Sequence, residues 1–173
     1  DVPITVESET RPGDIPAAKK SGESSGNSGP KVRRRSKEDI LKVLQDFERA
    51  GGGQRDGLYV LDHIPLKKRI NALVYCGVNQ EVLALIDTTM FGSATNCMLI
   101  TVQGVHFHNG WLTDTPGTFS FQYDEISADQ IKVSSAGEVV IAEGASFNCT
   151  GSGLNAPEVS GLILALLDAS INE

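Results

Sequence analysis

The sequence has few cysteines, few aromatic residues and, over its second half, almost no basic residues. Its three cysteines (Cys76, Cys97 and Cys149) are too sparse for a disulfide framework, so we expect reduced thiols. It has no run of about eighteen apolar residues, which excludes a transmembrane span, and its polar N-terminus lacks the apolar stretch of a signal peptide. We therefore expect a cytoplasmic protein.

Motifs of catalysis and of cofactor binding are also missing. There is no Gly-x-Ser-x-Gly, phosphate-binding glycine loop or His-Glu-x-x-His, so we predict that the chain is not an enzyme, has no catalytic residues and takes no cofactor. His106 and His108 alternate onto one face of a predicted strand, and Cys97 lies on the neighbouring strand. A metal or small-molecule site there is a weaker hypothesis, because the spacing of a firm zinc site is absent. We predict no metal and no small-molecule substrate.

The scarcity of basic residues bears on the partner. From residue 80 onward Lys132 is the only basic residue, against eleven acidic ones. Nucleic acids and anionic membranes are bound mainly by Lys and Arg, so we expect no nucleic-acid binding by this part of the chain. A basic protein partner fits such a surface better.

The residues that are present divide the chain into three parts. Residues 1–36 are rich in Ser, Gly, Pro and charge, which predicts a disordered tail, and the first residue is Asp1, so we expect a portion of a longer chain. Residues 37–57 predict a short amphipathic helix, started by a capping box of Ser36 and Asp39 and followed by a Gly-rich joint. Docking of this helix on the rest is the favoured interpretation, and a role in contacting another chain remains the alternative. Residues 58–173 predict one folded domain.

Within this domain the apolar period indicates a helix, then strands, then a second helix. The helix over 65–77 carries Leu66, Ile70, Leu73 and Val74 on one face and a basic cluster, predicted to face water, mostly away from it. Seven short strands are predicted over 81–149, after a short extended segment at 59–61. Asn155, with Glu158 three residues later, caps a strongly amphipathic terminal helix. The expected fold is α+β, mostly β: a seven-stranded antiparallel bent barrel or sandwich capped by the C-terminal helix.

The order of these segments resembles the bacterial pleckstrin-homology-like domains. The resemblance covers about residues 58–173 and rests on the segments IPLKKRINALVYCG, EVLALID, TTMFGS, CMLITVQGVHFHN and YDEI. It implies a bent barrel with a C-terminal helix, used as a binding or scaffold module. The chain departs from lipid-binding relatives, because residues 87–97 contain no Lys or Arg and residues 156–173 contain no Trp. The resemblance therefore does not imply lipid binding.

Two sets of residues are candidates for binding. The first, for a protein partner or a second copy in a homo-oligomer, is the loop after the first strand of the series together with a nearby tryptophan: Thr88, Thr89, Met90, Phe91, Gly92, Ser93 and Trp111. The second, for an anionic ligand or a membrane, is two basic clusters: Arg33, Arg34 and Arg35, and Lys67, Lys68 and Arg69. Membrane targeting is the less favoured alternative, because such clusters are usually solvated and some of these side chains could pair with the acidic domain.

Overall fold

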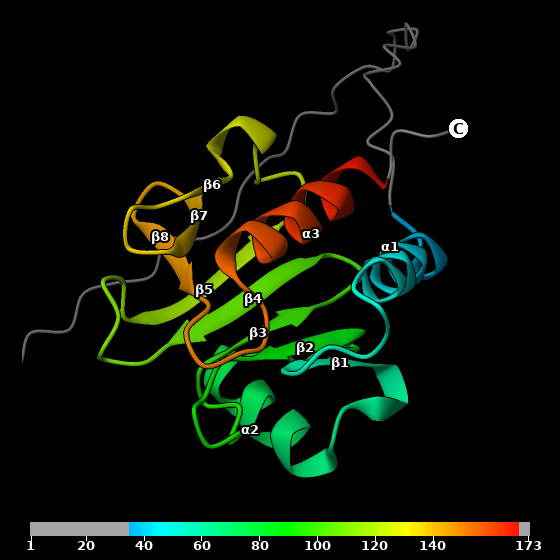
Figure 1. Cartoon of the computed structure of the whole chain (residues 1–173), viewed down its shortest axis with the longest axis horizontal. Coiled ribbons are helices and arrows are strands. Elements are labelled where there is room, and N and C mark those ends of the chain that lie inside the picture. Colours follow the sequence, from blue (N-terminus) through cyan, green and yellow to red (C-terminus); the bar gives the residue numbers. More distant parts are fainter. Residues whose placement is uncertain (1–34, 170–173) are drawn as a thin grey trace, which may run out of the picture. The chain divides into compact units, whose positions relative to one another are not determined.

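The computed structural model describes residues 35–169, in which three helices and two antiparallel sheets form one compact unit (Figure 1). The α-helices are α1 (Lys37–Ala50), α2 (Leu66–Cys76) and α3 (Ala156–Asp168). The strands are β1 (Leu58–Val60), β2 (Ala84–Asp87), β3 (Cys97–Ile100), β4 (Gly104–Asn109), β5 (Gly117–Gln122), β6 (Lys132–Val133), β7 (Glu138–Ala142) and β8 (Ala145–Asn148). Two short 3-10 turns, η1 (Leu61–His63) and η2 (Ala128–Gln130), complete the elements.

The strands pair in chain order. Strands β1 to β5 form a five-stranded sheet in the order 1-2-3-4-5, and β6 to β8 form a three-stranded sheet. The α+β class is confirmed. Within residues 35–169 the strands make two separate sheets and no closed seven-stranded barrel. The extended segment predicted at 59–61 is β1, an eighth strand that pairs with β2.

The large sheet is covered by helices on both faces. Alternate residues of β2 and β3 point to opposite sides: Ile86 and Met98 pack with α1, α3 and the small sheet, whereas Leu85 and Leu99 pack with α2. Figure 1 shows α2 on one side of the sheet and α3 on the other. Strands buried on both faces lose the polar alternation of a one-sided sheet. The all-buried sequences of β2 and β3 follow from this arrangement.

Helix α1 docks on the domain. Its Ile40 and Leu44 are fully buried in the larger core cluster, and the capping box of Ser36 and Asp39 is present. Arg55, in the segment after α1, forms an ion pair with Glu158 of α3 and lies over the Phe47 ring of α1. The favoured interpretation of residues 37–50 as a docked helix is therefore confirmed.

Two local features determine the turn between β3 and β4 and the start of α3. The turn between β3 and β4 brings Gly104 so close to β5 that a Cβ there would lie 1.9 Å from the carbonyl oxygen of Phe121. Asn155 and Glu158 form the predicted capping box of α3.

No helix in the described part of the chain is long and apolar enough to cross a membrane.

Candidate functional site

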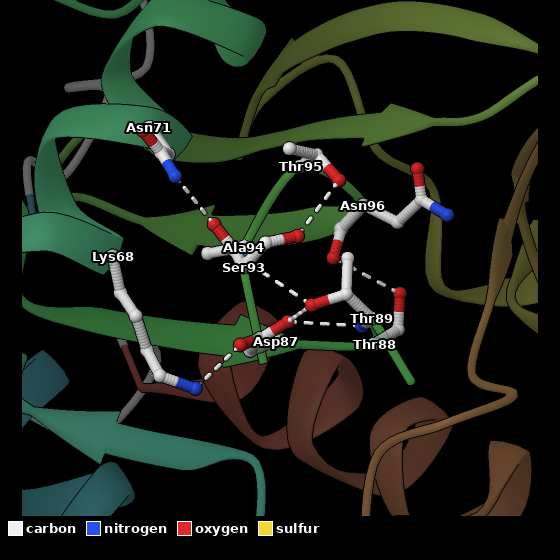
Figure 2. Close-up of polar contacts among 9 residues, drawn as sticks. All are labelled: Lys68, Asn71, Asp87, Thr88, Thr89, Ser93, Ala94, Thr95 and Asn96. Carbon is white, nitrogen blue, oxygen red and sulfur yellow. Dashed lines mark hydrogen bonds and ion pairs between the residues drawn. The ribbon is translucent and has the colours of Figure 1, made fainter. Parts of the chain in front are cut away.

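The β2–β3 loop is attached to α2 and β2 by a buried carboxylate. Asp87, the last residue of β2, is only 2% exposed. Its Oδ2 accepts a hydrogen bond from Lys68 Nζ of α2 at 2.6 Å, and its Oδ1 accepts bonds from the backbone N–H of Thr89, at 2.9 Å, and from the Thr89 hydroxyl (Figure 2). Burial lowers the pKa of Lys68, but the Asp87 carboxylate and Tyr59 outweigh it and hold this pKa above its usual value.

The rest of the loop is held by polar contacts of its own. The Thr89 hydroxyl accepts a hydrogen bond from the N–H of Ala94 at 3.0 Å, and the Thr88 hydroxyl donates to the Asn96 carbonyl at 3.1 Å. From α2, Asn71 Nδ2 donates to the Ser93 carbonyl at 2.8 Å. Figure 2 shows these contacts, which join the two arms of the loop to each other and the loop to α2. The base of the loop is therefore held in place without a ligand.

The tip of this loop carries exposed apolar side chains. Met90 is 82% exposed and Phe91 is 93% exposed. The residues of the candidate loop 88–93 therefore differ in role. Thr88 is buried, and Thr88, Thr89 and Ser93 form the hydrogen bonds that hold the base of the loop, whereas Met90 and Phe91 are exposed at its tip. A rigid base with two apolar side chains at its tip presents contact area at little cost in conformational entropy.

A second apolar tip lies at the same end of the sheet. Asp87 pairs with Cys97 and Cys97 with His108, so the β2–β3 and β4–β5 loops leave the sheet at one end. The β4–β5 loop exposes Trp111, at 83%, and Leu112, at 80%.

A groove of about 280 Å³ lies between this second tip and the C-terminal end of α2. It is lined by Tyr75, Thr95, Asn96, His108, Gly110, Trp111 and Leu112. Tyr75 contacts the His108 ring at a centroid distance of 5.0 Å. Leu112 and Tyr75 were not among the residues singled out in the sequence.

Helix α2 is rotated about its axis relative to the predicted orientation. The small Ala72 and Cys76 face the sheet, and Leu73 is partly buried against the same cluster. The other three residues of the predicted inner face, Leu66, Ile70 and Val74, are exposed. The predicted inner face is therefore correct for Leu73 and wrong for Leu66, Ile70 and Val74. At 3.6 residues per turn, the centre of Ala72 and Cys76 lies about 140° around the helix from Ile70. Two of the basic side chains, Lys68 and Arg69, contact polar groups of the chain.

The basic candidate residues are placed as follows. Lys68 pairs with Asp87, which agrees with the alternative that some residues of this cluster pair with the acidic domain. Arg69 donates a hydrogen bond to the carbonyl of Leu61 at 2.8 Å. Lys67 is exposed. Arg35 donates to the carbonyls of Leu166 and Leu167 near the end of α3 and lies over the Tyr123 ring. Arg33 and Arg34 lie outside the described residues.

The histidines and cysteines of the weaker metal hypothesis have other partners. His106 Nδ1 lies 2.8 Å from the Ser120 hydroxyl, and His108 Nδ1 lies 2.6 Å from the Thr95 carbonyl oxygen. Burial lowers the pKa of His106. The thiol of Cys97 lies 3.6 Å from that of Cys76, and this contact together with burial raises the pKa of Cys97. Among residues 35–169 no three His, Cys, Asp or Glu side chains are placed to hold a metal ion.

Comparison of the chain with family models, with curated proteins and with solved structures gave no match. The function is therefore inferred from the geometry of the site.

Proposed function

We propose that this chain is a non-catalytic interaction module of the cytoplasm that binds a protein partner through the apolar tips of two neighbouring loops. The observation that carries the proposal is the exposure of Phe91 on a loop whose base is held by the buried carboxylate of Asp87. Met90 on the same tip, and Trp111 and Leu112 on the β4–β5 loop, extend the apolar surface.

The magnitudes support binding by these side chains. An aromatic side chain buries about 150–250 Å² on contact, and each Å² of apolar surface removed from water contributes about 25 cal/mol. Phe91 and Trp111 would each contribute about 4 kcal/mol on full burial, before the cost of association is subtracted. Two such residues are enough to act as the central contacts of a protein interface.

The charge of the surroundings favours a basic partner. Asp114 is exposed three residues after Trp111, and Lys132 is the only basic residue from position 80 onward. A partner with Lys or Arg beside its apolar contacts would associate faster and with better complementarity than an acidic one. Membership of the bacterial pleckstrin-homology-like domains, many of which are binding modules, is part of the same proposal.

The test is affinity capture with matched baits. The wild-type chain should retain a partner that the double variant Phe91→Ala, Trp111→Ala loses. The control is Val133→Ala, which shortens an exposed aliphatic side chain on β6 of the other sheet. If the double variant and the control retain the same proteins as the wild type, the two loops are not the binding site.

A second candidate function is attachment to an anionic membrane. It is supported by the exposed Lys67 beside Leu66 and Ile70 on α2, because a basic residue next to apolar ones suits a membrane surface. Lys68 and Arg69 contribute less, since both already bind groups of the chain. Vesicles containing acidic lipid should carry the chain upward in a flotation gradient at low salt and release it at high salt. Absence of retention at low salt removes this candidate.

A further inference from the structure

A serine and a histidine of neighbouring strands form a hydrogen bond at the surface of the large sheet. Ser120 of β5 lies directly opposite His106 of β4, and its Oγ lies 2.8 Å from His106 Nδ1. His106 is 3% exposed, whereas Ser120 is exposed. Helix α2 reaches β5 at Thr118, whose hydroxyl donates to the Tyr75 carbonyl at 2.9 Å, and the helix ends at Cys76. The Ser120 hydroxyl is therefore an exposed group with a buried imidazole beside it.

The register of the two strands sets this close approach. The N–H of Tyr123 donates to the carbonyl of Gln103 at 3.0 Å, so residues 103 and 123 form a hydrogen-bonded pair. Hydrogen-bonded and non-hydrogen-bonded pairs alternate along an antiparallel ladder, which makes residues 106 and 120 a non-hydrogen-bonded pair. The side chains of such a pair lie closest together, because its Cα atoms are only about 4.5 Å apart. The contact is therefore set by the pairing of the strands and does not depend on the conformation of a loop.

A threonine determines which nitrogen of His106 carries the proton. Thr101 Oγ1 donates its single proton to the carbonyl of Gly104 at 3.1 Å. His106 Nε2 lies 3.4 Å from the same hydroxyl oxygen, so this contact forms with Nε2–H as the donor. The proton of the neutral ring is then on Nε2, and Nδ1 accepts a hydrogen bond from the Ser120 hydroxyl. Burial lowers the pKa of His106, which keeps the ring neutral at neutral pH.

A serine is activated as a nucleophile when a base lies within hydrogen-bond reach and a third group orients that base. Ser120, His106 and Thr101 have this arrangement, with Thr101 as the positioning residue. From these observations we propose that Ser120 is a site of covalent modification, at which the hydroxyl takes an acyl group from an activated ester with His106 as the general base.

The transfer is balanced in atoms and electrons. As Ser120 Oγ attacks the carbonyl carbon of the ester, its proton passes to His106 Nδ1. The bond between the carbonyl carbon and the ester oxygen then breaks, and the leaving alkoxide or phenoxide takes the proton from Nδ1. The products are acyl-Ser120, neutral His106 and one molecule of alcohol or phenol.

This modification goes beyond the proposed interaction function and does not rest on it. One acyl group is transferred per chain, so the chain is the acceptor and remains non-catalytic. The double variant Phe91→Ala, Trp111→Ala should be acylated at the wild-type rate, because neither residue takes part in the transfer. Failure of acylation leaves the proposed function standing, and failure of partner capture leaves the acylation standing.

The test treats the full chain with p-nitrophenyl acetate at neutral pH and follows acetylation of each serine by mass spectrometry of peptides. Ser135, in the turn between β6 and β7, is the internal control, because it is exposed and forms no hydrogen bond with a histidine in the described part of the chain. A general base contributes about 100- to 10,000-fold, so Ser120 should react about 100-fold faster than Ser135. In the chain unfolded by urea the two rates should be equal. A ratio under about ten in the folded chain overturns the proposal, and so does a ratio that survives unfolding.

Two variants identify the base. His106→Gln should slow acetylation of Ser120 to about the rate of Ser135. The matched control is His63→Gln, which removes an exposed histidine of η1 and should leave the rate at Ser120 unchanged. Circular dichroism checks both folds, and if His106→Gln is unfolded, the ratio of Ser120 to Ser135 in the wild type decides. A wild-type rate at Ser120 in folded His106→Gln overturns the proposal.

The nitrogen chemical shifts of the imidazole test the proton position directly. In the wild type they should place the proton of neutral His106 on Nε2. Thr101→Ser, which keeps the hydroxyl, should retain this tautomer, whereas Thr101→Val should increase the population of the other one. A wild-type chain with the proton on Nδ1 overturns the proposal, because Nδ1 could then not accept the proton of Ser120.

Discussion

Removing the carboxylate of Asp87 should both destabilise the chain and loosen the β2–β3 loop. Asp87→Ala deletes an ion pair to Lys68 and two hydrogen bonds to Thr89 from a position that is almost fully buried. Removing one partner of a fully buried pair costs about 3–5 kcal/mol. The Lys68 side chain is 19% exposed and can regain some water, which puts the expected loss near the lower end, at about 3 kcal/mol. This is a large part of the 5–15 kcal/mol typical of a domain.

Two further variants separate charge from hydrogen bonding at this position. Asp87→Asn keeps an acceptor for Thr89 and loses the charge facing Lys68, so it should cost about half as much. Lys68→Met leaves both Thr89 bonds in place but leaves the buried carboxylate of Asp87 without its cation, so it should also cost about 3 kcal/mol.

The assay is urea unfolding followed by circular dichroism, with the slope of the transition checked for constancy. Hydrogen exchange at the amides of Thr89 and Ala94 reports on the loop itself. In Asp87→Ala both amides should exchange faster than those of β7, even where the protein is still folded. A loss below about 0.5 kcal/mol together with unchanged exchange would falsify the view that Asp87 braces the loop.

Three other predictions follow from buried polar groups. Burial lowers the pKa of His106, so the unfolded chain binds a proton at this residue more readily than the folded chain does. The free energy of unfolding should therefore fall as the pH drops below about 6.5. In urea titrations between pH 7 and 5, His106→Gln should lessen this fall. Equal falls for both chains would contradict the assignment. All three cysteines are buried, and burial raises the pKa of Cys149 to about 12. A thiol-reactive dye at neutral pH should therefore label the cysteines only after unfolding. Rapid labelling of the native chain would contradict this prediction. Asn109 Nδ2 donates hydrogen bonds to the carbonyl oxygens of Ser146, at 2.6 Å, and Thr115, at 2.9 Å. Asn109→Ala should therefore lower the free energy of unfolding by about 2 kcal/mol in thermal or urea unfolding. A loss under about 0.5 kcal/mol would show that these bonds are not needed for stability.

Much of the local structure could be predicted from the sequence because its signals are local. The capping boxes at Ser36 and Asn155, and the hairpin turn at Gly104, depend on residues within a few positions of one another. The strands between 81 and 149 were placed to within a few residues. All paired strands are neighbours in the sequence, and what the strand pattern did not predict is the break between β5 and β6, where the segment that contains η2 separates the two sheets.

The orientation of α2 was mispredicted for a related reason. Counting apolar residues gives weight to large side chains, so Leu66, Ile70, Leu73 and Val74 defined the predicted inner face, of which only Leu73 packs on the core. The sheet instead receives the small Ala72 and Cys76, which let the helix approach closely. The buried carboxylate of Asp87 also binds Lys68, which is consistent with the observed orientation; the sequence indicated that a basic residue of the cluster could pair with the acidic domain, but not which acidic residue it would meet. Small residues at 72 and 76, four apart, were the one available signal.

The close approach at Gly104 has a consequence for how related chains can vary. A side chain at this position would have to displace the Phe121 carbonyl, so every descendant of this fold should retain glycine there, whatever it binds. Positions 66, 70 and 74 face outward and are under no such constraint from folding.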